Sequence, residues 1–293
     1  MKIYGYGLNN YRDEDVINDE NAIDYIKKRE NNFFEIYDKY VDFFPSNEVS
    51  LSDEMFDLSV ALGVNNPSNL KNYFKQYQEQ NLKPFFDSDF SYYSADFSKW
   101  ILPNFFYQSR FTITGENPRI MGAFSFLKFS NSLNKDMFNS YMNSLVDVYS
   151  NIIRKFKSVH IEEPAISSTE LDLFEMEMVS SFYEKLSQKV NTKINIFSSG
   201  DLECWWILDL KVNGVGLNFV NNPNNFKNFN FDTDKTIFAG FINDNKLDDT
   251  QINQIKKLKK NVKNLYICNV KPLSYYKNYE KVLENFNQLE GVI

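Results

Sequence analysis

The sequence predicts an α/β protein, a (β/α)8 TIM barrel that forms one domain over residues 1–293. Three observations lead to this prediction. From residue 136 onward, short apolar runs alternate with segments of helical periodicity, the pattern of parallel strands joined by right-handed crossovers. No glycine-rich phosphate loop follows a strand, which disfavours a doubly wound sheet. The chain length of 293 residues is close to that of a typical barrel.

The first half of the chain contains the less regular elements. KIYGYGL at 2–8 predicts the first strand, and residues 10–85 predict a mostly helical insertion near the N-terminus. No linker rich in Pro, Gly or Ser makes this insertion a separate domain. The remaining strand needed for a barrel of eight is expected in or near LKPFFDSDFSYY at 82–93, and NPRIMGAFSF at 117–126 predicts the strand that follows.

The second half alternates regularly. Helices are expected at 135–156, 168–190, 201–210, 248–260 and 276–288, the second of them opened by a Ser/Thr cap. Between them lie five predicted strands: SVHIEEP (158–164), KINIF (193–197), GVGLNF (214–219), TIFAGF (236–241) and NLYICNV (264–270). The asparagine-rich run at 218–235 is interpreted as a solvated loop.

Composition excludes several classes of protein. Lys and Arg number 32 against 39 Asp and Glu, a net charge of −7, and no basic stripe offers a footprint for nucleic acid. No run of eighteen apolar residues and no signal peptide is present, which predicts a cytoplasmic protein without a membrane span. Cys204 and Cys268 are far apart and outside any metal-binding spacing, so buried, reduced thiols are expected.

The segment VHIEEPA carries the strongest local signal for a site. The single histidine, His160, precedes Glu162 and Glu163, and Pro164 follows them. Alternation along a strand sends the two glutamates to opposite sides and places His160 on the side of Glu162. Barrels hold functional groups at the carboxyl ends of their strands, so these acids are candidate catalytic or ligand-binding residues. The alternative is a structural ion pair with a core histidine; a zinc site of His160, Glu162 and Cys268 is disfavoured by the lack of ligand spacing.

Three stretches together resemble one family, the cobalamin-independent methionine synthases. SKWILPNFFY at 98–107 matches the family's substrate-loop motif at Lys99, Trp100, Asn104 and Tyr107, while NPRIMGAFSFLKFS and VHIEEPA resemble the next two motifs in the same order. The resemblance covers roughly residues 85–293. It implies a protein of two similar barrels, of which the C-terminal one uses zinc to activate homocysteine for methylation by a reduced folate.

The resemblance also assigns the zinc ligands. The family's His, Cys, Glu and Cys fall on Asn195, Phe197, Asn218 and Lys271, a set that does not suit zinc. The chain therefore resembles the zinc-free N-terminal barrel of the family, here as a separate polypeptide. The resemblance implies an accessory subunit that docks on a separately encoded catalytic barrel, with no zinc of its own. Binding of folate or homocysteine, and the 98–107 loop as a platform for ligand or partner, are left open against a packed loop.

Two alternatives remain. The chain is an independent enzyme with Glu162 or Glu163 as acid and base and Lys99 or Lys271 as a charge-stabilising group, or it binds a small molecule without catalysis. A glycosidase pair would require a second carboxylate, for which Asp209 is the candidate. A barrel mouth filled by phenylalanine side chains would argue against the independent enzyme.

Overall fold

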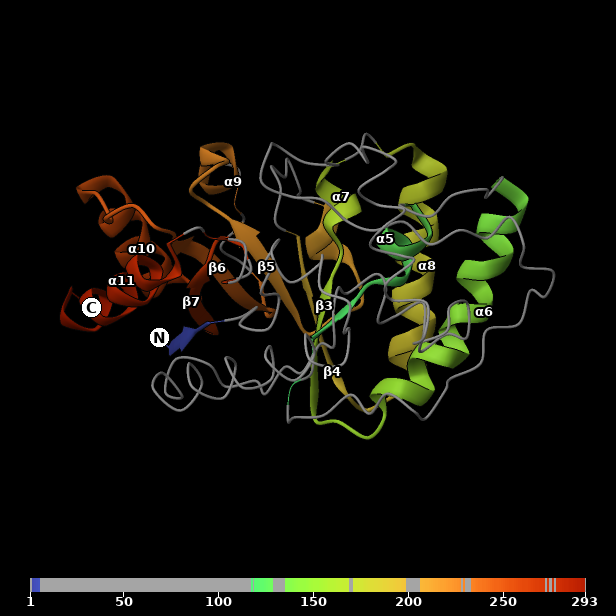
Figure 1. Ribbon diagram of the computed structural model, residues 1–293. Coiled ribbons are helices and arrows are strands. Elements are labelled where there is room, and N and C mark those ends of the chain that lie inside the picture. Colours follow the sequence, from blue (N-terminus) through green and yellow to red (C-terminus); the bar gives the residue numbers. More distant parts are fainter. Residues whose placement is uncertain are drawn as a thin grey trace, which may run out of the picture.

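The computed structural model describes residues 2–5, 117, 119–128, 135–168, 171–198, 206–227, 229, 233–271, 273, 276 and 278–292. The helical insertion expected at 10–85 and the strand expected at 82–93 lie outside these residues, as does the loop at 98–107. Within them the fold is a parallel sheet covered by helices (Figure 1).

Seven parallel strands form the sheet in the order β1-β7-β6-β5-β4-β3-β2. The seven strands predicted from apolar runs at 2–8, 117–126 and in the second half of the chain are thereby confirmed. Their bounds are β1 Lys2–Tyr4, β2 Arg119–Met121, β3 Ser158–Glu162, β4 Lys193–Phe197, β5 Gly214–Asn218, β6 Thr236–Ile242 and β7 Leu265–Asn269.

The sheet curls about its inner face. The Tyr4 hydroxyl on β1, at one end of the strand order, lies 3.3 Å from Nδ1 of His160 on β3, next to the other end. A flat sheet of seven strands would hold these two side chains more than 20 Å apart at about 4.8 Å per strand. The described sheet is therefore a strongly curved partial barrel.

Helices cover the outer face. Their bounds are α5 Ala123–Lys128, α6 Lys135–Ile153, α7 Pro164–Ser168, α8 Leu173–Lys189, η2 Trp206–Asp209, α9 Pro223–Lys227, α10 Asp249–Asn261 and α11 Tyr279–Val292. In Figure 1, α6 and α8 lie beside the β2 to β4 end of the sheet, and α10 and α11 lie beside β6 and β7. Their apolar stripes and the outward residues of the strands form the main core.

Helix starts follow local capping chemistry. Asp172 caps α8: its side chain accepts a hydrogen bond from the backbone N–H of Glu175. In turn, the side chain of Glu175 accepts a hydrogen bond from the backbone N–H of Asp172. The Ser/Thr cap expected a few residues earlier is wrong in position. The same reciprocal arrangement joins Asp248 and Gln251 at the start of α10.

Three expectations need correction. The run 117–126 is a strand only at Arg119–Met121, because α5 begins directly after Gly122. The asparagine-rich run holds a short helix at Pro223–Lys227, with proline at its first position as helices favour. Within the helix expected at 201–210, the described part is the single 3₁₀ turn Trp206–Asp209.

Candidate functional site

The carboxyl end of β3 carries two adjacent acids whose side chains leave in opposite directions. Glu162 lies on the inner face of the sheet with His160, whereas Glu163 turns outward to the helices. Both are 0% exposed. Strand alternation explains this separation, and it means that the two carboxylates do not act on one substrate atom from two sides.

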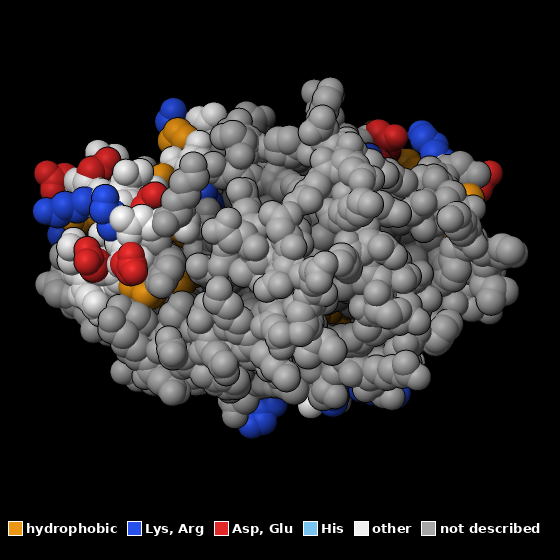
Figure 2. Space-filling view, in the orientation of Figure 1, with side chains coloured by type: hydrophobic (Ala, Val, Ile, Leu, Met, Phe, Trp, Pro, Cys, Tyr) orange, Lys and Arg blue, Asp and Glu red, His pale blue; other side chains and the backbone are white. Residues whose placement is uncertain are grey.

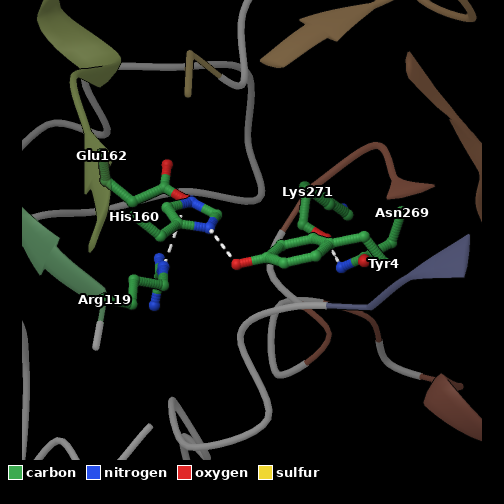
Figure 3. Close-up of polar contacts among 6 residues, drawn as sticks. All are labelled: Tyr4, Arg119, His160, Glu162, Asn269 and Lys271. Carbon is green, nitrogen blue, oxygen red and sulfur yellow. Dashed lines mark hydrogen bonds and ion pairs between the residues drawn. The ribbon is translucent and has the colours of Figure 1, made fainter. Parts of the chain in front are cut away.

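Glu162 is held by a basic residue and a histidine. Its Oε1 accepts from Arg119 Nε at 3.1 Å and lies 2.6 Å from Nε2 of His160 (Figure 3). Burial alone would raise the pKa of Glu162, but the charge of Arg119 and the contacts with His160 outweigh it and lower the pKa. Glu162 is therefore a carboxylate at neutral pH, which does not suit a general acid.

One oxygen of Glu162 differs from the other. Its Oε2 is buried and forms no hydrogen bond with any described residue. A buried carboxylate oxygen normally has a partner, since leaving it without one costs about 1–3 kcal/mol. In Figure 3 this oxygen points away from His160 and Arg119. The inner end of β3 thus offers an acceptor for a hydrogen-bond donor.

Aromatic rings fill the space beside this network. Tyr4 reaches from β1 to His160, whose ring stacks on Phe197 with centroids 3.5 Å apart. Tyr4, Phe197, Phe238 and Cys268 form one buried cluster on the inner face. The inner face from β1 to β4 is therefore packed with side chains. The buried Cys268 thiol has its pKa raised by desolvation and by the nearby Glu162.

Glu163 ties β3 to two helices. Oε2 accepts from the backbone N–H of Ser125 at 2.8 Å and from its hydroxyl at 2.6 Å, and Oε1 accepts from Phe124 N at 3.3 Å and from the Tyr183 hydroxyl at 2.6 Å. These donors come from the start of α5 and the middle of α8. A Cβ on Gly122 would lie 2.0 Å from Cδ of Glu163, so this approach requires glycine.

The electrostatics of Glu163 match a structural role. Desolvation raises its pKa, although the hydrogen bonds from Ser125 and Tyr183 work in the opposite direction. Burial, reinforced by Glu163, raises the pKa of Tyr183 well above its usual value. All four bonds of Glu163 go to the protein itself, so its carboxylate presents no open acceptor to a substrate.

Two of the positions that the resemblance assigns to zinc ligands lie on β4. Asn195 donates from Nδ2 to the Ser158 hydroxyl at 3.0 Å, and Phe197 stacks on His160. A Cβ on Gly216 of β5 would lie 2.3 Å from the Phe197 ring, so glycine makes room for this ring. An amide held by serine and a phenyl ring do not fit zinc.

Of the other two positions, Asn218 is the last residue of β5 and Lys271 follows β7. The Asn218 Oδ1 accepts from the backbone N–H groups of Val220 and Asn221 at 3.0 and 2.9 Å, which closes a turn. The Lys271 ammonium lies 4.8 Å from the centre of the Tyr276 ring. Asn218 is engaged in shaping the chain, and a lysine cation repels a metal ion, so neither fits zinc.

Other metal and acid arrangements are not formed by the described residues. Across the strands and helices that the structure describes, no group of three or more His, Cys, Asp and Glu side chains is placed to hold a metal. Asp209 is exposed in η2, which leads into the amino end of β5, away from the carboxyl end of β3. The glycosidase pair of Glu162 or Glu163 with Asp209 is therefore wrong.

No helix in the described ranges is long and apolar enough to cross a membrane.

Sequence reasoning missed Tyr4, Arg119, Ser125 and Tyr183. A lone arginine beside the apolar run of β2 was the one available signal for Arg119, because a buried charge needs a partner. Lys99, Trp100, Asn104 and Tyr107 lie outside the described residues, so their roles stay predictions.

Several known proteins are similar to this chain. Proteins named 5-methyltetrahydropteroyltriglutamate–homocysteine methyltransferase match with 22% identity over 241 residues in Halalkalibacterium halodurans and 27% over 240 residues in Thermotoga maritima. These alignments cover 69% and 71% of this chain but 31% and 32% of the relatives. The chain thus spans about a third of the length of the curated relatives it matches.

A solved structure and a family model complete the comparison. A B12-independent methionine synthase from Shewanella sp. W3-18-1, in complex with selenomethionine, aligns with a TM-score of 0.43 and 11% identity over 60% of this chain and 62% of that chain. Residues 8–266 match the family model of the cobalamin-independent synthase N-terminal domain. That match extends over most of the sequence, and the chain belongs to the family of cobalamin-independent synthase N-terminal domains.

Proposed function

We propose that this chain is the zinc-free barrel of a methyl-transfer system, acting as an accessory to a zinc-carrying barrel that methylates homocysteine from 5-methyltetrahydropteroyltriglutamate. Membership of the N-terminal domain family supports the reaction class, since the matched relatives carry that activity in their name. The observation that carries the accessory role is Phe197, which stands where the resemblance assigns a cysteine ligand and stacks on His160.

Packing around this position favours an accessory role over independent catalysis. Replacing Phe197 by a ligand would open a hole between His160 and Phe238, whose rings both contact it. The same aromatic filling argues against acid–base catalysis at the inner face. Of the two acids, Glu162 has a lowered pKa and Glu163 is fully bonded to the protein, so neither is poised for proton transfer near neutral pH.

The contact with the catalytic barrel, or with folate, is proposed to involve Lys99, Trp100, Asn104 and Tyr107. Resemblance to the family's substrate-loop motif supports this assignment. We also infer that the seven strands belong to a closed (β/α)8 barrel, with the eighth strand supplied by residues 82–93 between β1 and β2 and a helical insertion at 10–85. The curl that brings Tyr4 to His160 supports this closure.

The test uses the full chain, alone and with a zinc-carrying methionine synthase barrel from the same cells. Zinc content, co-purification and methyl transfer to homocysteine are measured for each. We expect no stoichiometric zinc and no transfer by the chain alone, and co-purification with the catalytic barrel that Trp100→Ala weakens. Stoichiometric zinc together with methyl transfer by the chain alone would overturn the proposal.

A second candidate, small-molecule binding at the inner end of β3, is favoured by the Oε2 atom of Glu162. This buried acceptor has no hydrogen-bond partner among the described residues, and an amine or N–H group of a folate or homocysteine molecule would supply one. Calorimetric titration with each compound tests this, with Glu162→Gln as the variant. Heat signals that are the same in the variant and the native chain would exclude Glu162 as the anchor.

A further inference from the structure

A shallow groove with a mixed apolar and polar lining lies between α6 and α8. Its volume is about 200 Å³. Met142 of α6 and Met178 and Phe182 of α8 supply its apolar lining, and Glu177 and Lys185 stand among the polar residues at its edge. Methionine and phenylalanine side chains give adaptable apolar contacts, which suits a groove that receives another surface.

The start of α8 adds exposed apolar surface to the groove. Leu173 is 78% exposed and Phe174 is 44% exposed, and they are the two large hydrophobic residues with exposed side chains in the described part of the chain. Phe174 also lines the groove. In Figure 2, hydrophobic atoms emerge among acidic and basic side chains at the end of the molecule where α6 and α8 lie. An apolar patch with a charged rim is typical of a protein interaction surface.

The charges along α8 are self-complementary. Glu177, Ser181 and Lys185 follow one another at intervals of four residues and all line the groove. They therefore form one stripe, with the acid and the base each about 6 Å from the central serine along the helix axis. A two-fold rotation about an axis through Ser181 brings Glu177 of one copy to Lys185 of the other, and the same contact occurs twice.

We propose that this groove is an interface at which a second copy of the chain docks, with α8 antiparallel to α8 of the other copy. The small side chain of Ser181 at the crossing point lets the two helices approach closely. Leu173 and Phe174 come to lie beside the last turns of the other copy's α8, where their apolar surface is withdrawn from water. In this arrangement the exposed apolar residues Leu173 and Phe174 are covered, and Glu177 and Lys185 pair with the opposite charges of the other copy.

The intramolecular contacts of α8 leave this stripe available. Glu175 pairs with Lys128 and Lys189 pairs with Asp147, so these charges are committed within the chain. Glu177 forms no ion pair with any described residue. Lys185 donates one bond to Oδ1 of Asn143 at 2.8 Å, which positions its ammonium at the groove and leaves two further donors.

The test is the mass in solution of the full chain, measured by sedimentation over a range of concentrations. The native chain is expected to shift toward twice the mass of one chain as concentration rises. Glu177→Lys and Lys185→Glu each place like charges at both contacts and should raise the dissociation constant about tenfold or more. An equimolar mixture of the two variants, or the double variant E177K/K185E, restores opposite charges at both contacts and should restore the dimer.

The matched control is Glu284→Lys, which makes the same charge change at an exposed position of α11, a helix that contributes nothing to the groove. Its dissociation constant should equal that of the native chain. Urea unfolding of every variant shows that each remains folded. A native chain that stays monomeric, a dimer insensitive to both reversals, or a mixture that fails to re-form the dimer would overturn the proposal. Methyl transfer does not enter this test, so it fails independently of the proposed function.

Discussion

Glu162→Gln is expected to destabilise the fold by about 3–5 kcal/mol at pH 7, the cost of removing one partner from a buried ion pair. Glu162 and Arg119 form such a buried ion pair. The side chains of Glu162 and Arg119 are 0% and 3% exposed, and the bond between Oε1 and Nε is 3.1 Å long. The substitution keeps the volume but removes the negative charge of Glu162 from beside the buried Arg119 cation. Unfolding in urea, monitored by far-ultraviolet circular dichroism, measures the free-energy difference.

The sign of the pH dependence gives a sharper test. Because the folded pKa of Glu162 is lowered from the ordinary 4.5, its contribution to stability is complete above that value and is lost as pH falls through the folded pKa. The deficit of Glu162→Gln should therefore shrink as pH falls below about 4.5.

The control is Glu163→Gln, equally buried and one residue away. The pKa of Glu163 is raised, so its contribution is complete below the ordinary value and falls as pH rises through the folded pKa. The deficit of this variant should therefore shrink with rising pH, the opposite slope. A loss below about 1 kcal/mol for Glu162→Gln, as for an exposed ion pair, or the same slope in both variants, would refute the reasoning.

Three further substitutions test the packing. Gly122→Ala forces a Cβ to within 2.0 Å of the Glu163 side chain and should lower the urea midpoint by the equivalent of at least about 1–3 kcal/mol; an unchanged midpoint would mean that Glu163 moves freely. Phe197→Ala removes a buried ring and should lower the free energy of unfolding by about 3–5 kcal/mol. A decrease of less than about 1 kcal/mol would show that the inner face is loosely packed. Tyr4→Phe deletes the 3.3 Å contact with His160 and should cost about 1 kcal/mol by thermal or urea unfolding, whereas a cost above about 3 kcal/mol would mean that this bond has a larger role than its length indicates.

The sequence was sufficient for much of the sheet. Short apolar runs separated by helical periodicity predicted seven strands, since each strand buried on both faces has this pattern. A period of two also predicted the divergence of Glu162 and Glu163. The failures came where side-chain contacts from elsewhere in the chain decide the local structure. At 122–123 the chain changes from strand to helix, and Glu163, forty residues later, binds the start of that helix.

The partners of the two acids could not be predicted for the same reason. Arg119 reaches Glu162 because β2 pairs with β3 in a register that places Arg119 opposite His160, and register between distant strands is not encoded in either segment alone. Tyr4 meets His160 across the curled inner face, a contact that depends on the curvature of the whole sheet. Tyr183 reaches Glu163 from α8, through the packing of a helix on the outer face.

The pairing of β1 with β7 has a consequence for synthesis on the ribosome. Ile3 lies opposite Ile267, so the first strand and its partner are separated by nearly the whole described chain. At translation rates of about 5–20 residues per second, β1 waits roughly 15–50 s before β7 is made. Throughout that interval Tyr4 has no β7 beside it, and the apolar residues of β1 are open to incorrect pairing. We therefore expect the nascent chain to depend on chaperones until β7 emerges from the ribosome. The pairing of β1 with β7 can form only after that point.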